Sequence, residues 1–293
     1  MNNAVRSLWI DGIALWAPAL PGWAVAAPAL RSACAASEAS DANAAPSAAG
    51  TEVTAATAGR RPRPGMLAPN ERRRAPDAVL LALEVASAAV AASGHAAASL
   101  ASVFTSAHGD LATTDALCRQ LATEPLLLSP TRFHHSVHNS GSGYWAIGSG
   151  SAAASTALSA FEHSFAAGWF EAACQCAADG EPRLLVGADT EAVGALASVN
   201  RSRGLLAVAL VLAPAASARS VWAIDWQRVA APAIAPPLRS AAAMALAVNA
   251  MADALPLFEV LAEGRAAGLV LPLSATSHLV LALRPLRPPG ALS

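Results

Sequence analysis

The apolar positions of this chain fall into short strand-like runs and longer helix-like runs. A short run of mostly apolar residues, bounded by glycine, proline or polar residues, is typical of a buried strand. Such runs predict strands at Leu8 to Leu15, Ser99 to Ser106, Arg183 to Gly187, Leu205 to Leu212, Ser220 to Trp226, Leu269 to Leu273 and His278 to Leu283. We expect the fourth and fifth to pair around a turn at Pro214 to Arg219, and the last two to form a hairpin.

The helix-like runs carry start and stop signals. Pro76 can begin a helix in its first turn, and Asp77 suits the positive end of the helix dipole. Gly94 can end that helix after the apolar stretch Val79 to Val90. Further helices are predicted at Thr113 to Ala122, capped by Thr113 or Thr114, at Phe161 to Ala178, and at Ser240 to Glu263, broken at Pro256 and ended by Gly264. Strands alternating with buried helices indicate a layered α/β domain.

The segment from Ser129 to Glu191 combines a histidine-rich loop, a tight turn and a helix. The small residues of Gly141 to Ala157 let backbone approach backbone, as a turn buried between layers requires. The helix Phe161 to Ala178 follows, and its first turn is expected inside the domain. A group at that point faces the positive end of the helix dipole, which can acidify a thiol.

A single domain over residues 1–293 fits this pattern, with a flexible insertion at residues 34–64. The insertion is rich in Ala, Ser and Thr and cannot bury enough apolar surface to offset the entropy of ordering. Charged residues make up only 13% of the chain and its mean hydropathy is +0.42, but its long apolar runs are interrupted, so no membrane span is expected. An N-terminal signal peptide is disfavoured because Asp11 and Pro18 interrupt the apolar run after Arg6.

The types of side chain in the sequence exclude several classes of reaction and ligand. All nineteen basic residues are arginine, which excludes P-loop nucleotide hydrolysis and pyridoxal Schiff bases, and we expect no cofactor. With a net charge of −1, the chain lacks the overall positive charge that a nucleic-acid-binding protein uses to bind phosphates. His134, His135 and His138 lack the accompanying ligands of a metal site, so no metal is predicted. Four cysteines without zinc-binding spacing favour a reduced, cytoplasmic setting.

Several motifs together resemble the β-ketoacyl synthases of the thiolase-like superfamily. They are Leu8-Trp9-Ile10-Asp11-Gly12-Ile13, Asn70-Glu71-Arg72-Arg73-Arg74-Ala75-Pro76, Ser136-Val137-His138-Asn139, Gly143-Tyr144-Trp145 and Ser164-Phe165-Ala166-Ala167-Gly168. The chain looks like the half-length, chain-length-factor-like subunits of aryl polyene and related pigment pathways. This resemblance implies an α/β, thiolase-like layered fold of the α-β-α-β-α type, with an N-terminal ketosynthase-like half and a shortened C-terminal part.

The departures from that family concern its catalytic residues. The resemblance puts Glu162 at the position of the nucleophilic cysteine, and a slip of one residue would give Phe161 or His163. None of these can form an acyl thioester, and Glu162 could simply cap its helix. The two histidines that full-length ketosynthases supply from their C-terminal half are missing as well, since His278 is the only histidine after the central segment. We therefore expect a scaffold that has lost condensing activity.

The resemblance also suggests two functional surfaces. The loop that lies near the dimer interface in related folds would present a partner-facing or acyl-tunnel set, formed by His135, His138, Asn139, Tyr144, Trp145 and Ser164. A structural hydrogen bond from His138 to backbone is the alternative. Arg72, Arg73 and Arg74 would form a docking surface for an acidic acyl carrier protein, or else a solvated turn.

Two hypotheses for function follow. The first is a non-catalytic subunit that forms a heterodimer with a full-length β-ketoacyl synthase and sets the length of the chain elongated on an acyl carrier protein. The second is an autonomous enzyme that hydrolyses or decarboxylates acyl thioesters with Glu162 and nearby histidines. An acyl chain on a glutamate would be a mixed anhydride, a poor store for a growing chain, which favours the first hypothesis.

Overall fold

The computed structural model describes residues 5–31 and 61–286, so most of the predicted insertion at residues 34–64 lies outside the described residues. The strands are β1 (Arg6–Ala17), β2 (Leu20–Pro21), β3 (Ala101–Thr105), β4 (Ser155–Leu158), β5 (Arg183–Asp189), β6 (Leu206–Ala213), β7 (Trp222–Val229), β8 (Ala267–Ser274) and β9 (Ser277–Pro285). The helices are α1 (Trp23–Arg31), α2 (Pro69–Arg74), α3 (Asp77–Ser93), α4 (Leu111–Thr123), α5 (Pro130–Ser136), α6 (Ser140–Ser149), α7 (Ser164–Asp179), α8 (Ala241–Leu246) and α9 (Leu255–Glu263). Short 3-10 turns are η1 (Ala97–Ser99), η2 (Pro125–Leu127), η3 (Phe161–His163), η4 (Gly194–Ser198) and η5 (Ala252–Ala254).

The strands form one mixed sheet in the order β4-β3-β5-β6-β1-β7-β9-β8, with β2 paired to β1. Strand β3 runs parallel to β4 and β5, and the remaining neighbours are antiparallel. The predicted hairpin is confirmed as β8 and β9. The predicted pairing of β6 with β7 is wrong, because β1 lies between them and bonds to both. A local sequence pattern cannot reveal a strand inserted from the other end of the chain.

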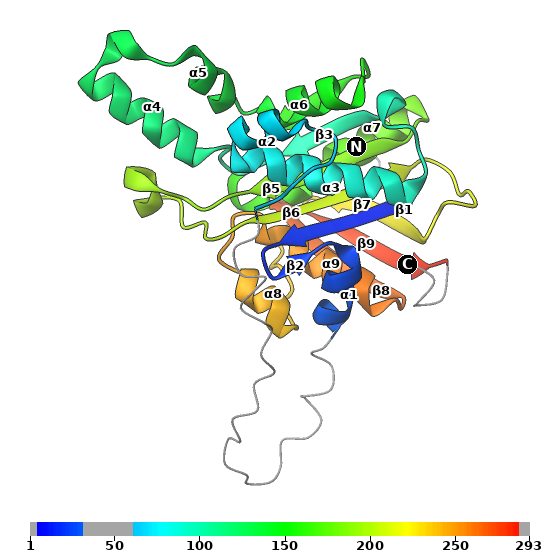
Figure 1. Cartoon of the computed structure of the whole chain (residues 1–293). Helices are drawn as coiled ribbons and strands as arrows, with labels where there is room; N and C mark the ends of the chain where they lie inside the picture. Colours follow the sequence, from blue (N-terminus) through cyan, green and yellow to red (C-terminus); the bar gives the residue numbers. More distant parts are fainter. Residues whose placement is uncertain (1–4, 32–60, 287–293) are drawn as a thin grey trace, which may run out of the picture.

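A hydrophobic core lies on each face of the sheet, as the layered α/β prediction requires. On one face α3 packs across β1, β5 and β6, and its Leu81 and Leu83 are fully buried. On the other face α1, α7 and α9 contribute to a core in which Phe165, Trp169 and Phe258 are fully buried. Figure 1 shows α3 above the central strands and α1 and α9 below them. Helix α7 contacts β3 and β5 as well as β8.

Strand β1 meets α3 at a bulge that requires glycine. The register of β1 against β6 shifts between Ile10 and Gly12, and a Cβ atom on Gly12 would lie 2.1 Å from the carbonyl oxygen of Ala89. The adjacent Asp11 is buried; it accepts a hydrogen bond from Ser220 Oγ at 2.8 Å and contacts His95 Nε2 at 2.8 Å. This carboxylate therefore joins β1 to the segments that follow α3 and precede β7.

The segment predicted as a loop and a tight turn is largely helical. Ser129 caps α5 through a hydrogen bond to the Arg132 amide, and Pro130 occupies its first turn. The small residues before β4 form helix α6, in which a Cβ atom on Gly141 would meet Ala82 and Phe104 at ordinary contact distance. The turn predicted over these residues is therefore replaced by a helix in the first part of the segment.

Helix α4 starts earlier than predicted. Its cap is Asp110, whose carboxylate accepts a hydrogen bond from the Thr113 amide at 2.9 Å, so the predicted threonine cap is wrong. The boundaries of α3, with Gly94 in the left-handed conformation after its last turn, match the prediction. So does the end of α9 at Gly264, although a break before Leu255 separates α9 from α8.

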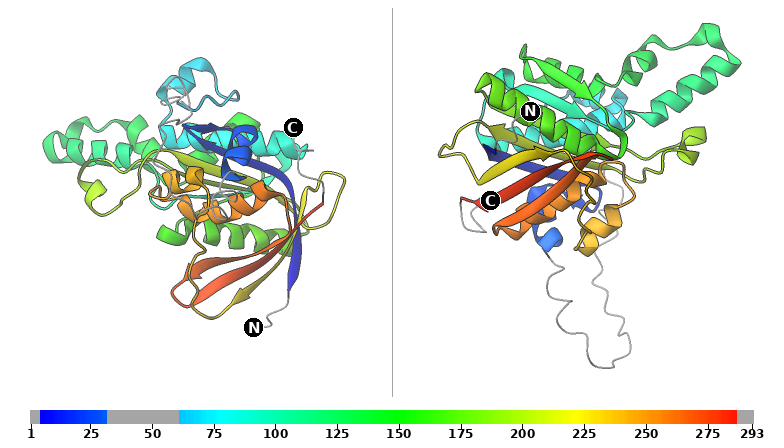
Figure 2. Two further views of the ribbon diagram at one scale, coloured as in Figure 1. Left: turned by 90° about the horizontal axis from the view of Figure 1, so that it is seen from below. Right: turned by 180° about the vertical axis from the view of Figure 1, so that it is seen from behind.

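Helices α4 and α5, joined by η2, form an arm that extends away from the sheet (Figure 1 and the right view of Figure 2). The arm exposes apolar side chains to an unusual degree, since Leu126 is 97% and Phe133 65% exposed. Leu121 and Leu127 are exposed on it too. Several large apolar side chains exposed on one projecting segment favour a surface that binds another protein.

Candidate functional site

The turn between β4 and α7 holds the position predicted for a nucleophile. Among the described residues other than glycine, Phe161 alone has a positive φ, at 49°. Ser164 is fully buried and stabilises this turn, because its hydroxyl accepts from the Ala160 amide at 3.0 Å and donates to the Phe161 carbonyl at 2.8 Å. Glu162 is exposed. The turn is therefore strained, well supported and open to its surroundings.

The first turn of α7 is capped by a residue from a distant segment. Asp253 Oδ2 accepts hydrogen bonds from the amides of Phe165 at 2.9 Å and Ala166 at 3.3 Å. Burial raises the pKa of Asp253 to about 8, although these amides act in the opposite direction. The expectation that Glu162 caps this helix is therefore wrong. The donors that would face an anion at the start of α7 are already bonded to the chain's own carboxyl group.

A histidine and a buried aspartate lie beside this turn. Asp189, at the end of β5, is fully buried and accepts from the Ala107 amide at 2.9 Å. Its Oδ1 lies 3.6 Å from Nδ1 of His108. Burial raises the pKa of Asp189, while hydrogen bonds from Ala107 and Ser106 and the nearby His108 lower it. The loop after β3 is thus held to β5 by one carboxyl group.

A pocket of about 680 Å³ lies beside the start of α7. Four segments line it: the loop after β3, the η3 turn, the loop before β6 and the segment from α8 to η5. Its polar lining residues are His108, Glu162, Asn200, Arg201, Ser202, Asn249 and Asp253. We call it the α7 pocket below. No group of metal-binding side chains occurs in the part of the chain that the structure describes.

No thiol replaces the missing nucleophile in the described residues. Burial raises the pKa of Cys174, and it raises the pKa of Cys176 to about 12. Both lie within α7 and not at its start. Cys118 is exposed on the arm, in α4. The described cysteines therefore lack the acidified thiol that a condensing reaction needs at the helix start.

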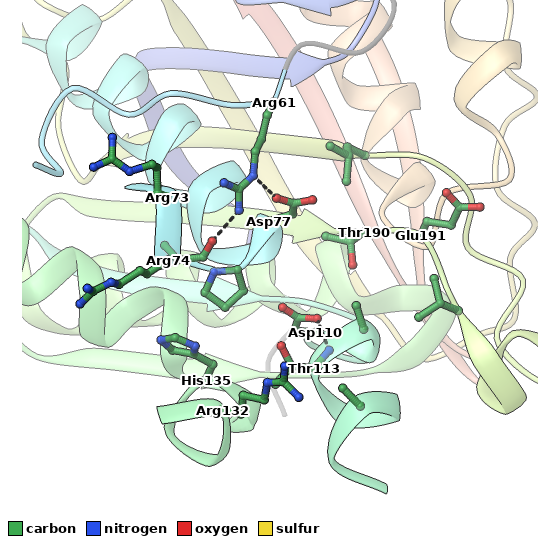
Figure 3. A pocket seen from close by; sticks show the side chains of 16 residues that line it. Arg61, Arg73, Arg74, Asp77, Asp110, Thr113, Arg132, His135, Thr190 and Glu191 are labelled. Atoms are coloured by element: carbon green, nitrogen blue, oxygen red, sulfur yellow. Dashed lines mark hydrogen bonds and ion pairs between the residues drawn. The ribbon is translucent and has the colours of Figure 1, made fainter. Parts of the chain in front are cut away.

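A second pocket, of about 670 Å³, lies beside α2 and is rich in arginine. Figure 3 shows Arg73 and Arg74 of α2 on one side and Arg132 and His135 of α5 on another. Arg61 is not free, because it pairs with Asp77 at 2.5 Å and bonds to backbone carbonyls. Of the predicted arginine cluster, Arg73 and Arg74 are exposed and line this pocket, whereas Arg72 is half-buried.

The family model for the β-ketoacyl synthase N-terminal domain matches residues 45–265. The chain belongs to this family. No curated protein matches the sequence. Within the described residues, no helix is long and apolar enough to cross a membrane.

Solved structures share the thiolase-like fold of this β-ketoacyl synthase family member. A ketosynthase in complex with its chain length factor from Xenorhabdus doucetiae matches with a TM-score of 0.66 and 20% identity, over 94% of this chain and 99% of that chain. The ishigamide ketosynthase/chain length factor gives a TM-score of 0.64 and 16% identity, over 96% and 100%. A type II polyketide acyl carrier protein in complex with its ketosynthase matches with a TM-score of 0.66 and 11% identity, over 97% of this chain and 100% of that chain. At these identities the matches establish the shared fold.

In this family member the residues predicted for a partner or acyl tunnel do not converge on one cavity. His135 is buried, and its Nε2 lies 2.9 Å from the hydroxyl of Tyr144. Burial lowers the pKa of His135 and raises that of Tyr144. His138 Nε2 lies 3.1 Å from the Ser106 carbonyl oxygen, which is the structural bond considered for it.

The remaining three predicted residues lie apart from one another. Trp145 is buried in the core beneath α3, whereas Ser164 belongs to the turn before α7. Asn139 is exposed at the start of α6, where its carbonyl oxygen accepts from Ser142. A role for any of the six at a partner's tunnel stays a prediction.

The sequence did not reveal His108 and Asp253 as site residues. Asp253 is separated from Phe165 by 88 positions, and nothing in the pattern around it indicates that it reaches α7. Asp189 gave a usable signal, because an acidic residue at the end of an apolar strand is seldom buried without a specific partner. The sequence around His108, which lies between β3 and the cap of α4, gave no such signal.

Proposed function

We propose that this chain is a non-catalytic subunit that pairs with an active β-ketoacyl synthase and helps to set the length of the chain elongated on an acyl carrier protein. One observation carries the proposal: the turn that would hold the nucleophile presents Glu162, and Asp253 occupies the amides at the start of α7. A condensing enzyme needs a thiolate there. The scaffold is retained while the chemistry has been replaced by structural contacts.

Pairing is supported by the edge of the sheet. Strand β4 ends the strand order and, among the described strands, bonds only to β3. An open edge offers backbone donors and acceptors to a strand of another chain. Two of the similar structures are ketosynthase and chain length factor pairs, which agrees with a partner of the same fold.

The exposed apolar residues lie near the same edge. Helix α6 contacts both β4 and α5, so it connects the sheet edge to the arm. It exposes Ile147 at 82%, and the turn after β4 exposes Phe161 at 71%. We propose that β4, α6 and the arm form one partner-binding surface. If the apolar side chains of the arm are covered only in a complex, the exposure of Leu126 and Phe133 in the isolated chain is explained.

Carrier-protein docking is a separate part of the proposal. Arg72, Arg73 and Arg74 end α2, where positive charge complements the helix dipole. One of the similar structures is a ketosynthase bound by an acyl carrier protein. The exposed Arg73 and Arg74, with the half-buried Arg72 beside them, would attract an acidic carrier and would mainly increase the rate of association.

Co-expression with the ketosynthase encoded beside this chain tests the pairing. Replacing Leu126 and Leu127 on the arm by glutamate should abolish co-purification, whereas Ile234→Glu should not, because Ile234 is equally exposed, at 93%, but lies outside the arm. Loss of pairing in both variants, or in neither, would contradict the proposed surface. Product lengths with and without the chain then test the length-setting role.

The second hypothesis, an acyl-thioester hydrolase or decarboxylase, retains one supporting observation. Glu162 lines the α7 pocket together with His108. Under this hypothesis Glu162→Ala abolishes turnover of acyl thioesters by the purified chain. Under the first hypothesis the purified chain has no turnover to lose, and the substitution changes at most the product profile of the complex.

A further inference from the structure

Two residues that line the α7 pocket each have a buried side-chain atom with no hydrogen-bond partner within the described residues: His108 Nε2 and Asp253 Oδ1. The side chain of His108 is only 7% exposed. The two groups come from separate segments, the loop after β3 and the η5 turn. Buried polar atoms nearly always have a hydrogen-bond partner in native proteins. Two unpaired atoms among the residues of one pocket indicate a ligand.

His108 offers a hydrogen-bond acceptor to that ligand. Its Nδ1 faces two acceptors, the Gly109 carbonyl oxygen at 3.2 Å and Asp189 Oδ1 at 3.6 Å. In the neutral ring the proton therefore belongs on Nδ1, and Nε2 presents its lone pair. The missing partner of His108 is a donor.

Asp253 offers the complementary donor. Its Oδ2 accepts both amide hydrogens from the start of α7, so a proton on the carboxyl group belongs on Oδ1. Burial raises the pKa of Asp253 to about 8, which keeps the group protonated at neutral pH. The missing partner of Asp253 is an acceptor.

We propose that the α7 pocket binds a neutral amide ligand, whose N–H donates to His108 Nε2 and whose carbonyl oxygen accepts from Asp253 Oδ1. An amide is a small uncharged group that presents a donor and an acceptor side by side. The apolar remainder of the ligand would lie against Val199, Val248 and Phe161, which line the same pocket. Its volume of about 680 Å³ lies within the ~300–1,000 Å³ of small-molecule sites.

Charged ligands fit this arrangement poorly. A carboxylate has no hydrogen to donate to His108, and it would lie near Glu162. An ammonium group has no atom that can accept a hydrogen bond from the protonated Oδ1 of Asp253. Ordered water is the remaining occupant, since it can donate and accept. The proposal goes beyond the proposed pairing and holds or fails without it.

Three probes of matched length test the proposal in the full-length chain: hexanamide, hexanoate and hexylamine. The measurement is the NMR signal of the His108 ring in histidine-labelled protein at pH 7, assigned by its loss in His108→Phe. We expect hexanamide to shift this signal with a saturable dissociation constant of about 1 mM. Hexanoate and hexylamine should bind at least about tenfold more weakly, because each leaves one polar atom unpaired.

Substitutions at Asp253 provide a matched pair. In Asp253→Asn the amide oxygen can cap α7 and the amide hydrogens can replace the acid proton, so hexanamide affinity should be retained. Asp253→Leu removes the donor and should weaken hexanamide binding about tenfold or more. Thermal unfolding of each variant separates loss of binding from loss of folding.

The pH dependence gives an independent test. Above pH 8 the wild-type chain loses the Asp253 proton, so hexanamide binding should weaken, while in Asp253→Asn it should not. The other charged or titratable groups that line the pocket are His108 after β3, Glu162 of η3 and Arg201 before β6, and Asp189 of β5 acts electrostatically on Asp253. The variant leaves all four unchanged. Absence of a saturable shift with hexanamide, equal binding of the three probes, or loss of binding in Asp253→Asn would each overturn the proposal.

Discussion

At the scale of single residues, the turn before α7 concentrates strain and unusual burial in a few positions. Phe161 is held in the left-handed region by Ser164, which bonds to the backbone on both sides of it. Its ring is largely exposed, so packing does not offset the backbone strain. Strain of this kind persists where surrounding structure imposes it, and it is common at functional sites.

Replacing Phe161 by glycine should therefore stabilise the isolated chain. Glycine adopts φ near 49° without strain, which gains roughly 1 to 2 kcal/mol, and its greater freedom in the unfolded chain returns about half of that. We expect a net gain of roughly 0.5 to 1 kcal/mol in the free energy of unfolding, measured by urea denaturation. A loss of stability would show that the ring packs within the chain after all.

The raised pKa of Asp253 predicts that the free energy of unfolding depends on pH. Its pKa is about 8 in the folded chain, against about 3.9 when unfolded. Between these values the folded state binds more protons, so the free energy of unfolding falls as pH rises, by on the order of 1 kcal/mol per pH unit at most. Asp253→Asn does not titrate and should lack this slope. Urea denaturation at pH 5, 6 and 7 compares the two proteins; parallel curves would refute the buried, protonated state.

At the scale of elements, most strands and helices follow from local patterns, but their partners do not. The apolar run in β1 and the Pro76 and Gly94 signals around α3 are sufficient to predict both elements. The neighbours of β1 depend on strands about 200 positions away, which no local pattern records. A separation of 88 positions likewise hid the contact of Asp253 with α7, and the small residues that form α6 were mistaken for a turn.

The contact between β1 and α3 gives a sharp mutational test. Gly12→Ala places a Cβ atom 2.1 Å from a backbone oxygen of α3, which cannot move without shifting the helix. We expect a loss of about 3 kcal/mol in the free energy of unfolding. Gly268→Ala is the matched control in β8, because a Cβ there meets no atom within 4 Å. Similar losses in both variants would point to a general effect of glycine replacement in strands.

At the scale of the whole molecule, the chain has one well-packed body and one poorly covered region. The central strands β5 and β6 are buried on both faces, whereas the arm exposes apolar side chains and the edge at β4 exposes unpaired backbone groups. Isolated folded proteins rarely expose such surfaces together. We infer that the exposed region is covered by another chain.

Thiol labelling measures whether the arm is covered. Of the described cysteines, Cys118 on α4 is exposed and Cys176 is buried, so in a Cys34→Ser background Cys118 should react first with a thiol reagent. In the complex with its ketosynthase partner we expect this reaction to slow at least tenfold. An unchanged rate in a complex that demonstrably forms would place the arm outside the interface.

The central place of β1 has a consequence for synthesis of the chain. At ~5–20 residues per second, the ribosome releases β1 roughly 10 to 40 seconds before β6 and β7, its partners on either side. During that interval an apolar twelve-residue strand has both edges unpaired, a condition that favours aggregation. The nascent chain should therefore depend on chaperones, and fragments ending before β7 should be insoluble when expressed alone.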